Sequence, residues 1–314
     1  MTSRLSEIWT DLQTLAEDEG ALFIGATGFP AGDNEPFERW LDRGFEAGMH
    51  YLRRHAVIRR NPAERFPWAR SVVVLTFPYS PDRPAAGDTI DTRIARYAQG
   101  DDYHQVLDLL LRKVESKITE RVPDAKSWRY VDTGPLSDRA AATAAGAGWI
   151  GKNAMLIHEK YGSYFFIATL LTSLENDIEP DRVADRCGRC TRCIDACPTE
   201  AIVPDRMIDS NRCISYLTIE HRGAIAPALA TQREGNLFGC DICQEVCPWN
   251  SDAPPGLSAF ETRETYRATP VSDLLRLEQE AFSTLFRRSA VKRARRDGIM
   301  RNAALIATGS PEYP

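Results

Sequence analysis

The sequence lacks the features of several common protein classes. No stretch of it approaches the roughly 20 apolar residues that a transmembrane helix needs. Its N-terminal residues open an amphipathic segment and do not contain the apolar core of a signal peptide. No GxGxxG motif follows an expected strand and no P-loop is present, which argues against a nicotinamide-binding Rossmann fold. We therefore expect a cytoplasmic protein that does not bind a membrane.

Cysteine is absent from most of the chain, because all eight cysteines lie between Cys187 and Cys247. The first four form a Cys-x2-Cys-x2-Cys-x3-Cys-Pro run that ends at Pro198. Bacterial ferredoxins hold a cubane iron–sulfur cluster with this spacing. The second four are more widely spaced and are also followed by a proline, Pro248.

In two-cluster ferredoxins the cysteine before the proline ligates the other cluster. This rule predicts two [4Fe–4S] clusters with crossed ligands. The expected ligands of one cluster are Cys187, Cys190, Cys193 and Cys247. The expected ligands of the other are Cys197, Cys213, Cys240 and Cys243.

Two other uses of cysteine remain open. Zinc sites more often contain paired CxxC knuckles than a continuous run of this kind. A disulfide scaffold is typical of secreted proteins and does not suit a chain without a secretory signal.

Length and charge limit the remaining classes. With 314 residues, the chain is too long for a ferredoxin alone and suggests about two domains. Its 39 basic and 44 acidic residues give a net charge of −5, which argues against coating of a polyanion but is compatible with a local basic patch.

The first 175 residues alternate between expected helices and strands, which predicts an α/β or α+β domain. A long helix begins after Asp101 or Asp102, either of which can cap it, and Pro123 ends it. The other expected helices cover residues 5–16, 36–55 and 140–147. The expected strands cover residues 21–26, 71–77, 128–132 and 162–171.

A basic run follows a linker at residues 252–256. Residues 287–301 contain seven cations and one acid, Asp297. The run is either a solvated helix face or a surface that contacts phosphates. The cations are Arg287, Arg288, Lys292, Arg293, Arg295, Arg296 and Arg301.

Several segments resemble the epoxyqueuosine reductase family, whose members use cobalamin and iron–sulfur clusters to complete queuosine in tRNA anticodons. The similarity covers nearly the whole chain. The matching segments are 96–104 (RYAQGDDYH), 131–136 (VDTGPL), 148–153 (GWIGKN), 213–220 (CISYLTIE), 247–250 (CPWN) and 301–304 (RNAA).

The resemblance implies an α+β protein of three parts. Residues 1–175 would form a nitroreductase-like α/β domain that binds cobalamin base-off, and residues 176–252 a ferredoxin-like domain with two [4Fe–4S] clusters. Residues 253–314 would form a short helical C-terminal region, where family members commonly carry a longer helical-repeat domain that helps to hold the tRNA.

The resemblance also implies an oxidoreductase that converts epoxyqueuosine to queuosine with loss of water. Electrons would pass from the clusters to cobalamin and then to the epoxide. The expected partners are the tRNA and an electron donor of flavodoxin or ferredoxin type, and we expect a monomer. Two alternatives remain: a non-catalytic electron-transfer or cobalamin-handling protein, and a reductive dehalogenase.

Candidate site residues follow from the matching segments. Asp132, at the end of an expected strand, is the predicted proton donor and a cofactor contact, although aspartate is also common as a cap of such turns. The small residues of 144–148 are expected to approach a flat macrocycle closely. Other contacts expected near the corrin or its tail are Arg59, Tyr97, Arg139, Lys152 and Ser215. The expected tRNA phosphate contacts are Lys292, Arg293, Arg296 and Arg301.

Overall fold

The computed structural model describes residues 3–30, 34–79, 87–134, 136–233 and 235–308. Its centre is a four-stranded sheet in the order β1-β2-β6-β3, in which every neighbouring pair is antiparallel. The strands are β1 (Phe23–Gly28), β2 (Ser71–Pro78), β3 (Ser127–Tyr130) and β6 (Phe165–Thr172). All four were predicted from the sequence, with ends that differ by a few residues.

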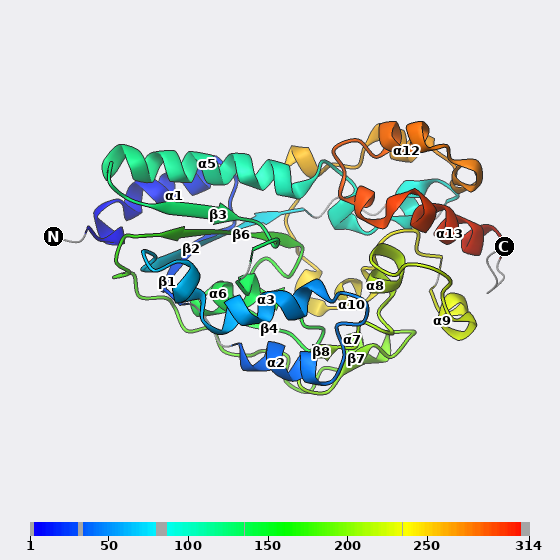
Figure 1. Cartoon of the computed structure of the whole chain (residues 1–314), viewed down its shortest axis with the longest axis horizontal. Helices are drawn as coiled ribbons and strands as arrows, with labels where there is room; N and C mark the ends of the chain where they lie inside the picture. Colours follow the sequence, from blue (N-terminus) through cyan, green and yellow to red (C-terminus); the bar gives the residue numbers. More distant parts are fainter. Residues whose placement is uncertain (1–2, 31–33, 80–86, 135, 234, 309–314) are drawn as a thin grey trace.

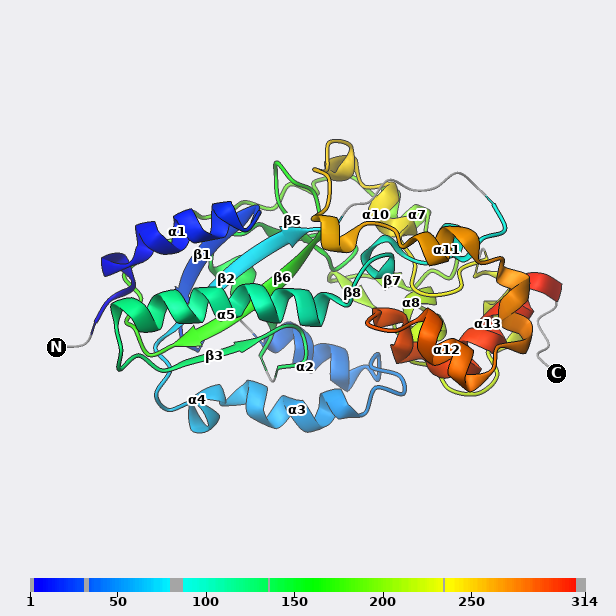
Figure 2. The same ribbon diagram turned by 90° about the horizontal axis from the view of Figure 1, so that it is seen from above.

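Helices cover both faces of this sheet (Figures 1 and 2). One face packs on α1 (Trp9–Asp18) and α5 (Tyr103–Arg121), whose apolar stripes meet strand residues such as Val73 and Leu75. Val72 and Val74 point to the opposite face, where α6 (Asp138–Ala144) packs. Because helices cover both faces, β2 is buried along its whole length, and its continuous β-branched sequence suits this position. The α+β class is confirmed.

The single helix predicted for residues 36–55 is wrong. The chain forms α2 (Glu35–Asp42) and α3 (Tyr51–Arg60), followed by α4 (Pro62–Arg65). The break between α2 and α3 contains left-handed backbone at Gly44 (φ 66°) and Ala47 (φ 52°). It is held by the cysteine-rich segment, since the amide of Gly48 donates to the hydroxyl of Tyr216 over 2.9 Å.

The small residues around 144–148 approach the protein itself rather than a ligand cavity. A side chain at Gly25 would meet the carbonyl oxygen of Ala145 at 2.6 Å, so the end of α6 lies against strand β1. A side chain at Gly148 would meet the carbonyl oxygen of Ile157 at 2.1 Å. That glycine therefore permits the pairing of β4 (Trp149–Ile150) with β5 (Leu156–Ile157).

The cysteine-rich segment contains short elements only. Its helices are α7 (Arg192–Asp195), α8 (Ile214–Ile219), α9 (Pro227–Thr231) and α10 (Ile242–Glu245), and its strands are β7 (Ile202–Val203) and β8 (Met207–Ile208). The helices that follow are α11 (Glu264–Ala268), α12 (Gln279–Leu285) and α13 (Arg295–Thr308). The 3₁₀ turns are η1 (Leu5–Glu7), η2 (Ile90–Arg93), η3 (Arg96–Ala98), η4 (Pro248–Asn250), η5 (Ser258–Phe260), η6 (Val271–Arg276) and η7 (Ala290–Ala294).

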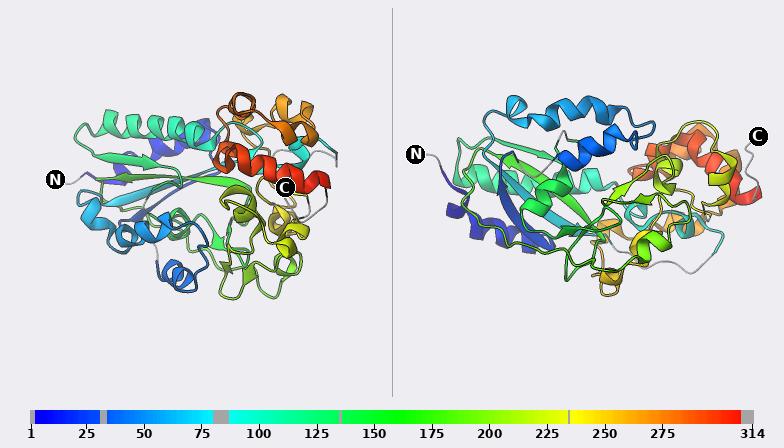
Figure 3. Two further views of the ribbon diagram at one scale, coloured as in Figure 1. Left: turned by 45° about the vertical axis from the view of Figure 1, so that its right-hand side comes forward. Right: turned by 90° about the horizontal axis from the view of Figure 1, so that it is seen from below.

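A second core joins three distant parts of the chain. It combines apolar side chains from residues 90–98, 237–238 and 266–303. The C-terminal helix α13 thus packs beside α8, and α12 lies at the same end of the molecule, opposite α1 (Figures 1 and 3). Among the described residues, no helix has the length and apolar content required to cross a bilayer.

Candidate functional site

A cavity of about 370 Å³ opens where the strands of the sheet end. Because neighbouring strands are antiparallel, β2 ends and β6 begins on this side, and the chain that leaves β3 places Asp132 there. The start of α6 completes the wall. The lining residues are Arg59, Tyr79, Tyr97, Tyr103, Val131, Asp132, Leu136, Ser137, Asp138, Arg139, Phe165, Phe166 and Ile167.

Asp132 stands in left-handed backbone with φ 45°, an uncommon conformation that aspartate tolerates better than most residues. Its side chain is 51% exposed and therefore accessible from the cavity. One carboxylate oxygen accepts a short hydrogen bond from the hydroxyl of Tyr103. The other lies 2.9 Å from Nε2 of His104. Two consecutive residues of α5 therefore fix the orientation of the carboxyl group.

His104 bridges two carboxylates. Its Nδ1 lies 2.7 Å from Asp102, the N-cap of α5, and its Nε2 faces Asp132. Desolvation lowers the pKa of His104, but the hydrogen bonds to Asp102 and Asp132 outweigh it and raise the pKa to about 9. At neutral pH the imidazole is therefore protonated beside the carboxyl group of Asp132.

The structure brings three of the predicted cofactor contacts, Arg59, Tyr97 and Arg139, to the same cavity as Asp132. Arg59 lies over the ring of Phe37 at 4.4 Å, and its buried Nε has no hydrogen-bond partner among the described residues. Desolvation lowers the pKa of this guanidinium. A ligand with an acceptor group would satisfy the unpaired nitrogen.

Lys152 and Ser215 do not line this cavity, and their contact with the corrin or its tail stays a prediction. The ammonium group of Lys152 donates to the carbonyl oxygens of Gly188 and Cys190 at 2.8 and 2.9 Å. Ser215 lies beside Cys213. Burial raises the pKa of the Cys213 thiol, although a hydrogen bond from Ser215 lowers it. Both residues support the cysteine-rich segment.

Sequence reasoning missed Asp138, another carboxyl group in the cavity wall. Desolvation raises its pKa to about 7, although a hydrogen bond from Thr169 (2.9 Å) opposes the shift. Asp138 stands in the first turn of α6, a common position for an acid, so its sequence position did not distinguish it from an ordinary helix-start residue.

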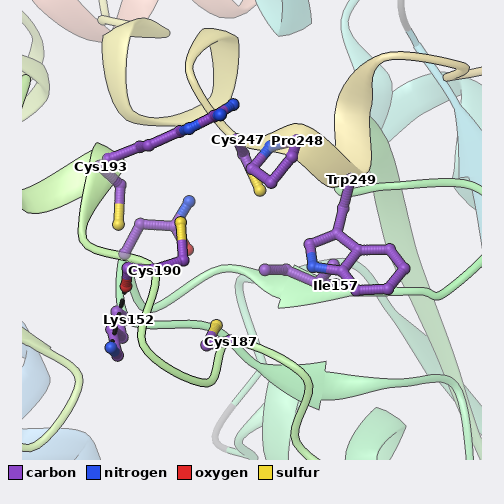
Figure 4. Close-up of a pocket in the computed structure, with 10 residues that line it drawn as sticks. Lys152, Ile157, Cys187, Cys190, Cys193, Cys247, Pro248 and Trp249 are labelled. Carbon is purple, nitrogen blue, oxygen red and sulfur yellow. Dashed lines mark hydrogen bonds between the residues drawn. The ribbon is translucent and has the colours of Figure 1, made fainter.

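Four cysteines surround one pocket: Cys187, Cys190, Cys193 and Cys247 (Figure 4). They are the set that the crossed-ligand rule predicted for one cluster, and Trp249 and Lys152 lie at its border. In the described part of the chain, no group of three or more His, Cys, Asp or Glu side chains is placed to hold a single metal ion. The spread arrangement suits a cluster better than one zinc ion.

The other four cysteines are also neighbours. Burial raises the pKa of the Cys240 thiol to about 12, and the nearby thiols of Cys213 and Cys197 raise it further. Cys243 interacts with Cys240 and Cys213 in the same way, and with Cys193 of the first group. The two groups are therefore adjacent, and the ligation of each cluster stays a prediction.

The second group connects to the cavity. Gln244 follows Cys243 and lies within hydrogen-bond distance of the hydroxyl of Tyr79, which lines the cavity (3.5 Å). Space beside Gly239 is limited by Tyr97, whose ring lies 3.4 Å from the position of an added side-chain carbon. The chain around Cys240 and Cys243 thus forms part of the support of the cavity wall.

Arg301 cannot contact phosphate as predicted, because it is buried. Its side chain is 4% exposed and donates to the carbonyl oxygens of Leu217, His221 and Gly223 at 2.7 to 3.0 Å. Its position four residues before the buried Leu305 places it on the inner side of α13.

The other three predicted phosphate contacts differ in their surroundings. Lys292 is exposed. Arg293 forms an ion pair with Glu220 (2.7 Å) and lies over the ring of Tyr51, whereas Arg296 pairs with the adjacent Asp297 at 3.0 Å.

Two family models match the chain. One, described as 4Fe-4S double cluster binding domain, covers residues 186–250, and the other, described as Epoxyqueuosine reductase QueG, DUF1730, covers residues 59–133. An epoxyqueuosine reductase from Leadbetterella byssophila is 38% identical over 299 residues, which include 94% of this chain and 97% of the relative.

Solved structures agree with the sequence relatives. An epoxyqueuosine reductase with a tRNA-Tyr epoxyqueuosine-modified stem loop has a TM-score of 0.83 and 30% identity, covering 96% of this chain and 81% of that one. A Bacillus subtilis epoxyqueuosine reductase has a TM-score of 0.82 and 29% identity, covering 96% and 82%. In the latter, a catalytic loop that carries an aspartate is swung out of the active site.

Proposed function

This chain belongs to the epoxyqueuosine reductase family, and on that premise we propose that it reduces epoxyqueuosine in tRNA anticodons to queuosine. The observation that carries the proposal is the carboxyl group of Asp132, held between Tyr103 and a protonated His104 in a cavity beside the cysteine groups. The reaction consumes two electrons and two protons, and the epoxide oxygen leaves as water.

Two [4Fe–4S] clusters would be held by the two cysteine groups, and when bound they supply single electrons. The first group lies under an exposed loop, and the second lies beside residues that support the cavity. We therefore propose that electrons pass from the surface through the first cysteine group and the second cysteine group to the cavity.

The cavity has features that fit part of a large amphipathic macrocycle. Leu136, Phe165 and Ile167 give it an apolar wall, whereas Arg59 offers a buried nitrogen without a partner. We propose that cobalamin binds here base-off, with Arg59, Tyr97 and Arg139 as contacts. When bound, cobalamin supplies a strongly reducing centre for the epoxide. We also propose that residues 1–175 form a nitroreductase-like domain and that the enzyme is a monomer.

Asp132 is the proposed proton donor. An epoxide oxygen gains negative charge as its bond to carbon breaks, and an acid positioned beside it lowers the barrier. His104 holds a proton at hydrogen-bond distance from Asp132, so it can restore the proton that Asp132 gives away. Tyr103 and Asp102 act as positioning residues, because they fix the carboxyl group and the imidazole respectively.

This arrangement predicts that turnover falls at alkaline pH. The pKa of His104 is raised from its ordinary value near 6.5 to about 9, so the folded protein keeps this proton at neutral pH and loses it as pH rises through about 9. Single-turnover rates measured from pH 6.5 to 9.5 should show a falling limb near the upper end. His104→Gln should lower the rate by about 10²-fold and remove that limb. A limb that persists in the Gln variant would assign it to another group.

The exposed cations of the basic run are proposed to contact tRNA phosphates. Replacing Lys292, Arg293 and Arg296 by Gln together should weaken tRNA binding and make its dependence on log salt less steep by roughly 2 to 3. Binding isotherms at several salt concentrations measure both effects. A matched triple variant on α5, with Lys113, Lys117 and Arg121 changed to Gln, should bind like the parent. If the two triple variants bind tRNA equally well, the basic run is a solvated helix face and does not contact phosphates.

Nucleoside analysis tests the function itself. Anaerobic protein with both cofactors and a chemical reductant should convert epoxyqueuosine-containing tRNA to queuosine-containing tRNA. An electron-transfer or cobalamin-handling protein would show the cofactor absorbance bands and no conversion. A dehalogenase would instead release halide from a halogenated aromatic substrate.

A further inference from the structure

The loop that carries the first cysteine group has a basic surface. Residues 182–192 contain four arginines, all exposed, and a single acid, Asp185. Asp185 is neutralised by a short ion pair with Arg206 and caps the amide of Cys187 over 2.8 Å. This concentration of positive charge occurs in a chain with a net charge of −5. The four arginines are Arg182, Arg186, Arg189 and Arg192.

Three of these arginine side chains make no polar contact with the rest of the described chain. The side chains of Arg182, Arg189 and Arg192 form no hydrogen bond or ion pair with any residue in the described ranges, whereas Arg186 pairs with Glu159 at 3.0 Å. Ile194 lies in the same surface with 37% of its side chain exposed, one of a few large apolar residues that the described chain exposes. Free cations around an apolar residue form a surface that a protein partner with an acidic face can cover.

The surroundings of the two cysteine groups differ in depth. Gly188, Arg189 and Thr191 in the first loop are exposed, and so are most of their neighbours. In contrast, Asp241 and Gln244, which flank Cys240 and Cys243, are buried. An external protein can therefore approach the first group more closely than the second.

We propose that residues 182–194 form the docking surface for an acidic one-electron carrier protein. The proposal rests on the proposed reductase function. Each docking event would deliver one electron from the reduced carrier to the cluster that the first cysteine group would hold, and the carrier would leave oxidised by one electron. Two such events supply the two electrons of one turnover, and the two protons enter through the side chains at the cavity.

The position of this surface favours a protein over tRNA. None of residues 182–194 lines the cavity that contains Asp132, where the modified base must enter. Arg192 instead lines the pocket between the cysteines of the first group. The basic run of residues 287–301 supplies a separate candidate surface for phosphates.

Charge reversal tests the proposal. We use holoprotein with both clusters and, as the probe, a photoreduced bacterial flavodoxin, and follow bleaching of the cluster absorbance by stopped flow without tRNA. Arg182→Glu/Arg189→Glu should slow reduction by flavodoxin by about 10-fold or more at low ionic strength, and the difference should shrink with added salt. Reduction by dithionite should be unchanged. The matched control, Arg65→Glu/Arg276→Glu, changes net charge equally at exposed sites elsewhere.

The rates of reduction by flavodoxin and the tRNA binding of the variants support or overturn the proposed docking surface. A loss of rate confined to flavodoxin and to the loop variant supports the proposal, and the milder Arg182→Gln/Arg189→Gln variant supplies the same comparison if charge reversal lowers the iron content. Equal slowing by the control pair overturns it. Weaker tRNA binding with an unchanged flavodoxin rate overturns it too and assigns the surface to nucleic acid. Because bleaching requires no tRNA, failure of the reductase activity is detected separately.

Discussion

Asp132→Asn should reduce turnover on epoxyqueuosine-containing tRNA by about 10²–10⁴-fold while the protein retains both clusters and its cobalamin. Asparagine has nearly the same shape and tolerates the left-handed backbone at this position (φ 45°), so the loop should keep its conformation. It also retains an oxygen that can accept from Tyr103. The variant loses the ability to transfer a proton between His104 and the substrate, together with the negative charge and the second acceptor oxygen beside His104.

The alternative role of Asp132 is to cap the turn at Gly134. That role predicts a modest loss of stability with turnover largely kept, so single-turnover rates and thermal unfolding separate the two. Asp108→Asn is a suitable control, because Asp108 forms ion pairs with Arg112 and Arg129 outside the cavity. Near-normal turnover by Asp132→Asn would refute the acid role.

Arg301→Ala should destabilise the protein by on the order of 3 kcal/mol, because it removes a buried guanidinium that donates to the carbonyl oxygens of Leu217, His221 and Gly223. For a chain of this size we expect Tm to fall by roughly 5–10 °C, measured anaerobically by circular dichroism together with cluster absorbance.

The control for this variant is Arg296→Ala, which removes a cation that pairs only with the adjacent Asp297 in the described structure. We expect it to change stability by less than about 0.5 kcal/mol. If Arg301→Ala has the same Tm as this control but binds tRNA more weakly, Arg301 contacts phosphate, as the sequence predicted, and the stability prediction is wrong.

Local sequence patterns predicted the sheet well, because each strand has its own apolar and β-branched run between turn residues. Asp102 could be recognised as one of two candidate caps for α5, and the structure selects it. Such features depend on neighbours in the sequence. The spacing also predicted that Cys247 lies with Cys187, Cys190 and Cys193, which line one pocket, whereas the ligation of each cluster stays a prediction.

Features that depend on distant residues were missed. The helical spacing of Trp40, Phe45 and Met49 continues without a break, whereas contacts with residues 167 to 168 positions away hold the turn that separates α2 from α3. His104 lies in a recognised segment, but its role depends on Asp132, 28 residues later. Arg301 was assigned from its charge, although the helical phase relative to Leu305 indicated the buried side.

The contacts of Arg301 also bear on the order of assembly. During synthesis on the ribosome, all the cysteines emerge before α13, so α8 is made before the donor that ties down its last turn exists. Until α13 is made, this side of the cysteine-rich segment therefore lacks the hydrogen bonds that Arg301 donates to Leu217, His221 and Gly223. A premature stop before Arg301 would leave the segment without this support.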